Sequence, residues 1–206
     1  MIITISGNPG AGDTTAADML GKELNYEVIK VGEIYKKLAK EKELEPDQLW
    51  EQQEKNPEKL KEFHKELDQK QKKIAKEKEN IVINGKLSAH HIPNADLKIL
   101  LTADIKERAK RILMRKKLGR KKYAEKVDEE KAQKDEEKEL SQKKLKKQIE
   151  KIKKREKKEK QHWEKIYEYN YLEDREKYDY VIDTTNKRPS EAVEEIKKRI
   201  KQVKDE

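Results

Sequence analysis

The sequence has no cysteine, which excludes disulfide bonds and metal sites built on thiolates. It also lacks any apolar stretch of 18 residues, the length that a membrane-spanning helix needs. Only 33% of its 206 residues are hydrophobic, whereas 46% are charged. A chain so poor in apolar residues can bury a core only where those residues are concentrated. We therefore expect one compact cytoplasmic domain with charged appendages, no signal peptide and no contact with a membrane.

The net charge of +9 is distributed unevenly along the chain. Residues 116–160 contain 20 Lys or Arg against 11 Asp or Glu, so this segment carries the whole excess. A local basic surplus favours polyanions, either nucleotide phosphates or nucleic acid. A general preference for lysine explains the surplus equally well, because only eight of the 52 basic residues are arginines.

Short apolar runs predict the strands of a buried sheet. Such runs occur at residues 1–5, 26–29, 80–83, 97–101 and 178–182, and helical patterns lie between them. Strands that alternate with helices are typical of a parallel sheet covered by helices on both faces. The sequence thus predicts an α/β fold.

Two stretches have too few apolar residues to be core elements. Residues 45–79 have a helical pattern that Pro46 and Pro57 interrupt. Residues 116–165 are rich in lysine, and their sparse apolar positions have helical spacing. The second stretch predicts either a long solvated pair of helices or a partly disordered segment. Both stretches are expected to be appendages of the α/β body.

The segment GNPGAGDTT, from Gly7 to Thr15, lies between the first strand and a helix. That order is the setting of a phosphate-binding P-loop, although Asp13 stands where the pattern has a lysine. An aspartate there is a good helix N-cap, but it competes with phosphate for the same main-chain N–H groups. A contact between like charges at about 4 Å costs roughly 4 kcal/mol at an effective dielectric constant near 20. A Mg²⁺ ion that bridges the carboxylate and the phosphate would make this interaction favourable. The sequence leaves both interpretations of Asp13 open.

This loop and four later segments resemble the archaeal-type cytidylate kinases, members of the P-loop nucleoside monophosphate kinase superfamily. The segments are VGEIYKKLAKEK, LDQKQKKIAKEKENIVINGKLSAHH, ADLKILLTADIKERAKRI and YDYVIDTTN. The resemblance implies a single P-loop kinase domain over residues 1–206, with five parallel strands and flanking helices. It also implies a helical NMP-binding arm at 31–79 and an enlarged lid at 116–165, where the two appendages lie.

The resemblance implies a role for individual residues as well. The donor ATP would be bound, at its phosphates, by Gly7, Asn8, Pro9, Gly10, Ala11, Gly12, Asp13, Thr14 and Thr15. Thr14 would also lie near Mg²⁺, because its hydroxyl follows the last glycine of the loop. The acceptor CMP would be bound by Lys36, Asp68, Lys70 and Lys86, where lysine replaces arginines of the family pattern. The lid would supply the catalytic arginines Arg111, Arg115 and Arg155.

Several of these residues also have a plain structural interpretation. For any one lysine, a solvated surface position is as probable as a ligand role, and Arg108 is expected in a surface ion pair. Asn84 stands where the family usually has Glu, and His162 where it has Arg. The leading prediction is a monomeric enzyme that transfers phosphate from ATP to CMP or dCMP. The alternatives are an adenylate kinase and a degenerate P-loop protein. The last would bind nucleotide, or RNA through its basic segment.

Overall fold

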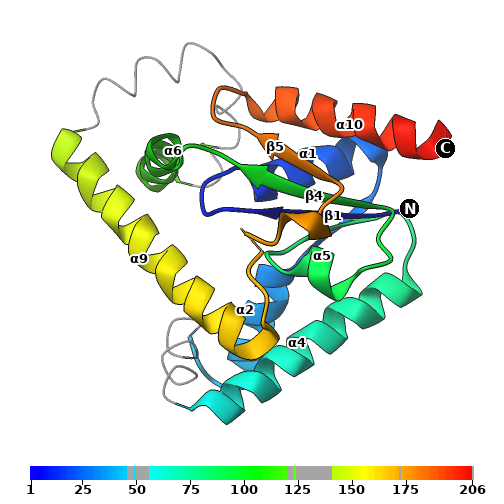
Figure 1. Cartoon of the computed structure of the whole chain (residues 1–206), viewed down its shortest axis with the longest axis horizontal. Coiled ribbons are helices and arrows are strands. Elements are labelled where there is room, and N and C mark those ends of the chain that lie inside the picture. The colour runs from blue at the N-terminus through cyan, green and yellow to red at the C-terminus, as the bar shows by residue number, and fades with distance from the viewer. Residues whose placement is uncertain (46–48, 50–55, 120–122, 124–140, 172, 206) are drawn as a thin grey trace.

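The computed structural model describes residues 1–45, 49, 56–119, 123, 141–171 and 173–205 (Figure 1). Its strands are β1 (Ile2–Gly7), β2 (Glu27–Lys30), β3 (Ile81–Asn84), β4 (Leu97–Thr102) and β5 (Tyr180–Asp183). They form one parallel sheet in the order β2-β3-β1-β4-β5. The predicted α/β fold with five parallel strands is confirmed. Because β1 is the central strand, the loop that follows it emerges in the middle of the sheet's carboxyl edge.

The helices are α1 (Asp13–Leu24), α2 (Val31–Glu41), α4 (Pro57–Glu77), α5 (Ser88–His91), α6 (Ile105–Leu118), α9 (Gln142–Tyr167) and α10 (Pro189–Asp205), with a 3₁₀ turn, η1 (Arg175–Lys177). Helices α1 and α10 lie together on one face of the sheet (Figure 1). The other face is covered by α5, part of α4 and the segment after α9. None of the described helices is long and apolar enough to cross a membrane.

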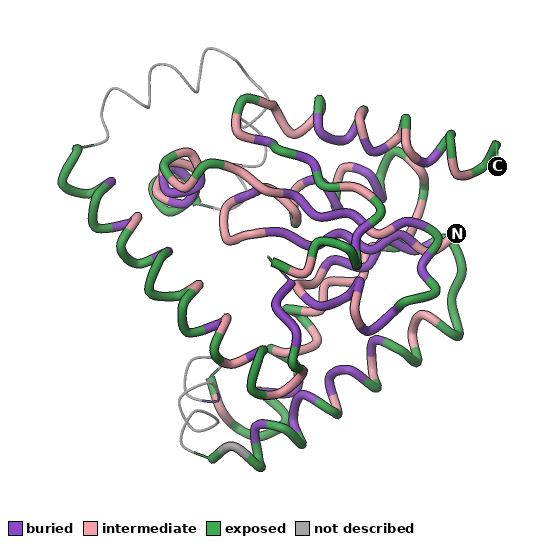
Figure 2. Tube along the Cα trace, in the orientation of Figure 1, coloured by how far each residue is buried: buried purple, intermediate pink, exposed green. Residues whose placement is uncertain are grey.

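The core follows the alternation of side chains along the strands. Ile3 and Ile5 of β1 are completely buried toward α1 and α10, whereas Leu100 of β4 packs on the opposite face against Trp163 and Tyr171. Buried segments accordingly run through the sheet, while the outer side of α9 is exposed along its length (Figure 2). The few apolar residues are thus concentrated in the sheet and its two covering layers.

Each predicted appendage contributes to a pair of packed helices. In the arm, α2 packs on α4 through Leu38 and Phe63. Helix α9, in the predicted lid, packs on α6, most of which precedes the lid, and Ile152 meets Ala109 and Ile112 there. Residues 46–48, 50–55, 120–122 and 124–140 of these predicted regions lie outside the described residues.

Candidate functional site

The loop from Gly7 to Thr15 joins β1 to α1. Gly10 and Gly12 have φ angles of 89° and 98°, in the left-handed region that favours glycine. A Cβ atom on Gly10 would lie 2.8 Å from the main-chain oxygen of Arg108, so the loop packs closely against α6. Gly12 is the N-cap residue of α1, and no side chain caps the helix. The prediction that Asp13 is the N-cap is therefore wrong, because Asp13 is the first residue inside the helix.

Asp13 belongs to a small polar network with Asn84 at the end of β3. The Asn84 side-chain amide donates to Asp13 Oδ2 at 3.0 Å and to the Ile5 carbonyl at 3.1 Å. Thr14 Oγ1 in turn donates to Asn84 Oδ1 at 3.1 Å. Burial raises the pKa of Asp13 above its ordinary value. The hydrogen bond from Asn84, the positive charge of Lys86 and the main-chain N–H groups of Asp13 and Thr14 act in the opposite direction and lower it. The carboxylate thus uses donors at the helix start that a phosphate could also use.

Helix α9 contacts the loop through Glu156. Asn8 Nδ2 donates to Glu156 Oε1 at 3.1 Å, and Arg108 Nη1 donates to the same oxygen at 2.6 Å. Arg108 also donates to the carbonyls of Ala103, at 3.0 Å, and Pro9, at 3.4 Å. The expected ion pair of Arg108 is present, with Glu156, but its expected place at the surface is wrong, because Arg108 is only 5% exposed. Its guanidinium instead links α6, α9 and the loop.

One turn further along α9, Glu159 binds two cations that come from different elements. The Glu159 carboxylate pairs with Lys86, which follows β3, and accepts from Arg155 Nε at 2.7 Å. Burial would raise the pKa of Glu159, but Lys86 and Arg155 lower it below its ordinary value. Glu159 Oε2 and the hydroxyl of Tyr171 are buried, and neither has a hydrogen-bond partner among the described residues.

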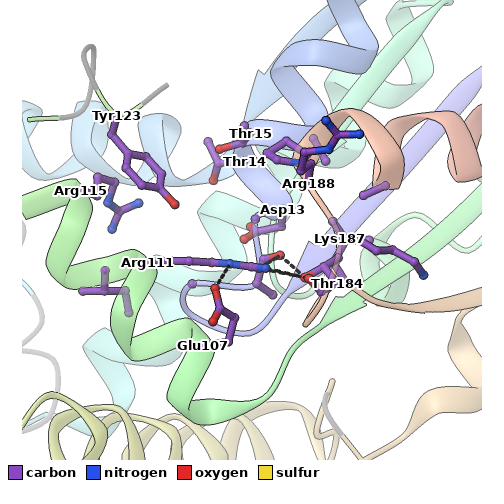
Figure 3. Close-up of a pocket in the computed structure, with 18 of the residues that line it drawn as sticks. Asp13, Thr14, Thr15, Glu107, Arg111, Arg115, Tyr123, Thr184, Lys187 and Arg188 are labelled. Atoms are coloured by element: carbon purple, nitrogen blue, oxygen red, sulfur yellow. Dashed lines mark hydrogen bonds and ion pairs between the residues drawn. The ribbon is translucent and has the colours of Figure 1, made fainter. Parts of the chain in front are cut away.

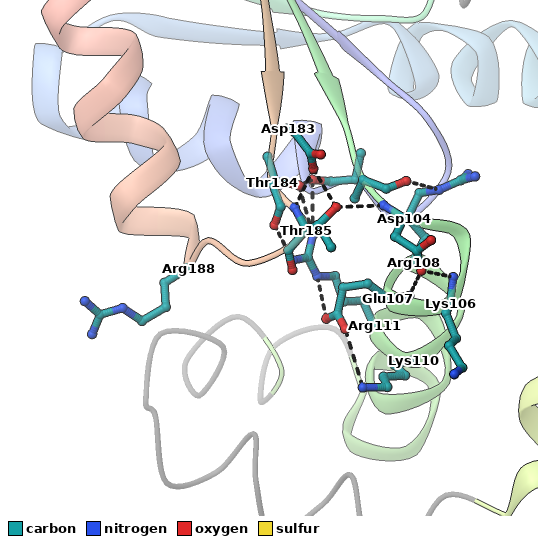
Figure 4. Close-up of polar contacts among 12 residues, drawn as sticks. Asp104, Lys106, Glu107, Arg108, Lys110, Arg111, Asp183, Thr184, Thr185 and Arg188 are labelled. Atoms are coloured by element: carbon teal, nitrogen blue, oxygen red, sulfur yellow. Dashed lines mark hydrogen bonds and ion pairs between the residues drawn. The ribbon is translucent and has the colours of Figure 1, made fainter.

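A pocket opens on the other side of the loop, between α6 and the start of α10 (Figure 3). Arg111 lies across it and donates to the Thr184 carbonyl at 2.7 Å and to Glu107 Oε1 at 3.1 Å (Figures 3 and 4). The pocket holds about 1030 Å³ of empty space, part of it open to solvent. Its lining includes Gly12, Asp13, Thr14, Arg111, Arg115, Tyr123, Thr184, Lys187, Arg188 and Pro189. The start of α1 and several cations thus share one pocket, which suits an anionic ligand.

The arm contributes a buried carboxylate, Asp68, which is 8% exposed. Its Oδ1 lies 3.0 Å from His91 Nε2 and accepts from Gln71 at 3.3 Å. Its Oδ2 accepts from the Tyr167 hydroxyl, in the last turn of α9, at 2.5 Å. Burial and this bond to Asp68 raise the pKa of Tyr167. The carboxylate is therefore fully engaged by side chains.

The four histidines of the chain gather around this carboxylate. The Nε2 atoms of His64 and His162 are 3.1 Å apart, and His90 and His91 are in ring contact with Tyr167. Burial and, to a smaller extent, the charge of His162 lower the pKa of His64 to about 4. Among the residues that the structure describes, no group of three or more His, Asp or Glu could hold a metal ion.

The predicted site residues fall into separate places. All nine residues of the loop surround the start of α1, and Lys86 and Arg155 meet at Glu159. Arg115 lines the pocket together with Arg111. Lys36 is exposed on α2, and Lys70 on α4 pairs with Glu41 and Glu66, at 3.8 Å and 3.5 Å.

Sequence reasoning missed several residues of the site. Helix α9 and the segment after it contain Glu156, Tyr167 and Tyr171. Most residues of α9 are charged, so the sequence does not indicate which of them face the site. Lys187 and Arg188 precede α10 and could have been found as basic residues between the last strand and a helix.

Oxygen donors suit a hard cation, so Thr14 and Asp13 fit Mg²⁺ in their chemistry.

The comparisons with known proteins agree with this geometry. Residues 2–147 match the model of the cytidylate kinase-like family. A cytidylate kinase of Methanothermobacter thermautotrophicus is 34% identical over 184 residues, 89% of this chain and 95% of that protein. One of Thermococcus kodakarensis is 32% identical over 186 residues, 90% of this chain and 80% of that protein. One of Archaeoglobus fulgidus is 37% identical over 115 residues, which span only 62% of its length.

Solved structures share the fold at much lower identity. An uncharacterized protein from Eubacterium ventriosum matches with a TM-score of 0.65 and 17% identity, over 98% of both chains. A shikimate kinase from Bacteroides thetaiotaomicron matches with a TM-score of 0.57 and 15% identity, again over 98% of both chains. At such identities the likeness shows the fold alone.

Proposed function

We propose, since the chain belongs to the cytidylate kinase-like family, that it transfers the γ-phosphoryl group of ATP to CMP or dCMP. The observation that carries this proposal is the glycine loop at the carboxyl edge of a parallel sheet, with a cation-lined pocket on one side. The paired cations Lys86 and Arg155 lie on the other side. A phosphoryl donor and an acceptor could therefore meet over the start of α1.

The donor ATP would occupy the pocket between α6 and α10. Main-chain N–H groups at the start of α1 would bind its phosphates, as helix N-termini do for anions generally. Arg111, held by Thr184 and Glu107, and Arg115 would face the nucleotide from α6. Arg188 and Pro189, at the start of α10, also line the pocket and would contact the nucleotide from that side.

Mg²⁺ would be held from the protein side by Thr14 and Asp13. When bound, it neutralises phosphate charge and orients the phosphate groups for in-line displacement. The Asn84 side chain bonds to both residues, so the hydroxyl and the carboxylate would face the donor phosphates together. Asp13 would thereby make ATP affinity depend on Mg²⁺, because without the cation the carboxylate repels the phosphates.

The acceptor would lie between α4 and α9. Lys86 would bind the CMP phosphate, Asp68 would accept from the base, and Lys36 and Lys70 are further proposed ligands on the arm. A phosphate oxygen of CMP attacks the γ-phosphorus, the bond from that phosphorus to the β–γ bridging oxygen breaks, and ADP leaves with the electron pair. Lys86 and Arg155 would stabilise the charge that builds up on the transferred group.

The test is ADP formation from ATP and Mg²⁺ with CMP, dCMP, UMP and AMP offered separately. We expect the highest turnover with CMP or dCMP, whereas AMP as the best acceptor would identify an adenylate kinase. Lys86→Gln should abolish most of the activity. The matched control Lys73→Gln changes an exposed lysine of α4 that pairs only weakly with Glu77, at 3.7 Å, and should leave activity unchanged.

The second candidate function is RNA binding without phosphoryl transfer. It is favoured by the solvent face of α9, where Lys143, Lys147, Lys151, Lys154 and Lys158 are all exposed and fall on one side of the helix. No turnover with any acceptor, together with RNA binding that weakens steeply with salt, would support this function.

A further inference from the structure

Helix α9 reaches the proposed acceptor site at two places. Near its middle, Glu159 pairs with Lys86, and at its end Tyr167 donates to Asp68. Lys86 and Asp68 are the two residues that the proposed function assigns to the phosphate and the base of CMP. Both contacts are well shielded, because Glu159 is 6% and Asp68 is 8% exposed. The same helix therefore occupies both ends of that site.

The Glu159 carboxylate resembles a bound phosphate in its chemistry. It places negatively charged oxygen between the ammonium of Lys86 and the guanidinium of Arg155, as a phosphate between two cations would. A phosphate has more acceptor oxygens than a carboxylate. The buried Tyr171 hydroxyl, which has no partner among the described residues, could donate to one of them.

The Tyr167 hydroxyl resembles the hydrogen-bond donor of a base. Asp68 Oδ1 lies 3.0 Å from His91 Nε2 and accepts from Gln71, so a ligand would reach the carboxylate at Oδ2. Tyr167 donates to this oxygen at 2.5 Å. A base with an amino group at that place could replace the hydroxyl, whereas a base with a carbonyl would leave the buried carboxylate unpaired.

We propose that Glu159 and Tyr167 stand in for the acceptor nucleotide in the empty site, and that CMP must displace both to bind. The two residues are eight positions apart on α9, about 12 Å along the helix axis, a span comparable to a nucleoside monophosphate. This inference rests on the proposed function. It makes two residues outside the phosphate-binding loop determinants of acceptor affinity.

The test is calorimetric binding of CMP, without any donor, to the wild type and to Glu159→Gln and Tyr167→Phe. Each variant weakens a contact that CMP has to break, so each should lower the Kd for CMP about tenfold. Glu164→Gln is the matched control, because Glu164 is an exposed residue of the same helix that pairs with Lys160. Its Kd should equal that of the wild type.

Unchanged or weaker CMP binding by both variants would overturn the inference, since α9 would then support the ligand instead of competing with it. Should Glu159→Gln fail to fold, Tyr167→Phe, which removes one oxygen atom, carries the test alone. Turnover assays separate the two proposals. A wild type that phosphorylates CMP while the variants bind no tighter refutes only this inference. A wild type that neither binds nor phosphorylates CMP refutes the proposed function and the inference with it.

Discussion

His64 should make the stability of the fold depend on pH. Its side chain is 2% exposed and packs against Phe63, Trp163 and Tyr167, so the charged form is poorly solvated. His162 and His91 face it and oppose its protonation, whereas Asp68 favours it, and the pKa is lowered from 6.5 to about 4.

The sign and the size of the effect follow from proton linkage. Between pH 6.5 and 4 the unfolded chain binds a proton at His64 and the folded chain does not. The contribution to stability is therefore complete above pH 6.5 and is lost as the pH falls toward 4. Each pH unit within this window costs about 1.4 kcal/mol, which gives about 3 kcal/mol over the whole range.

The assay is urea unfolding of the wild type and of His64→Gln at several pH values between 7 and 4. Acidic side chains that titrate in this range contribute to both proteins, so the comparison isolates His64. We expect the wild type to lose about 3 kcal/mol more than the variant between pH 6.5 and 4. Equal losses of unfolding free energy in the two proteins would refute the reasoning.

Three further predictions concern the phosphate-binding loop. Glu156→Gln should lower the free energy of unfolding by roughly 2 to 4 kcal/mol, because it leaves the buried guanidinium of Arg108 without its carboxylate; a loss below 1 kcal/mol in urea unfolding would contradict this. Gly10→Ala should lower the melting temperature and weaken ATP binding, since the added methyl group meets the main chain of Arg108 at a left-handed φ angle; wild-type values of both would show that the loop can shift. Asp13→Asn should tighten ATP binding in EDTA by about tenfold or more, and far less with Mg²⁺, because it removes a negative charge near the phosphates. An unchanged affinity in EDTA would mean that Asp13 does not face the phosphates.

The sheet and the glycine loop could be predicted because their signals are local. In so charged a chain, the apolar runs at residues 80–83 and 97–101 predict buried strands. Several glycines between a strand and a helix predict a tight turn. Asn84 illustrates what is not local: it reaches Asp13 because the parallel register places it opposite Ile5. Glu159 is one of four glutamates in α9, and only the packing of that helix decides which of them enters the site.

The aromatic cluster at the base of α9 has a spectroscopic consequence. Half of the eight tyrosines and one of the two tryptophans of the chain lie there, namely Trp163, Tyr167, Tyr169, Tyr171 and Tyr178. The near-ultraviolet circular dichroism of these rings and the fluorescence of Trp163 therefore report on the junction of α9 with the sheet. The far-ultraviolet signal, by contrast, follows the backbone as a whole. The protein thus contains its own optical reporter, with which undocking of this one helix can be told apart from unfolding.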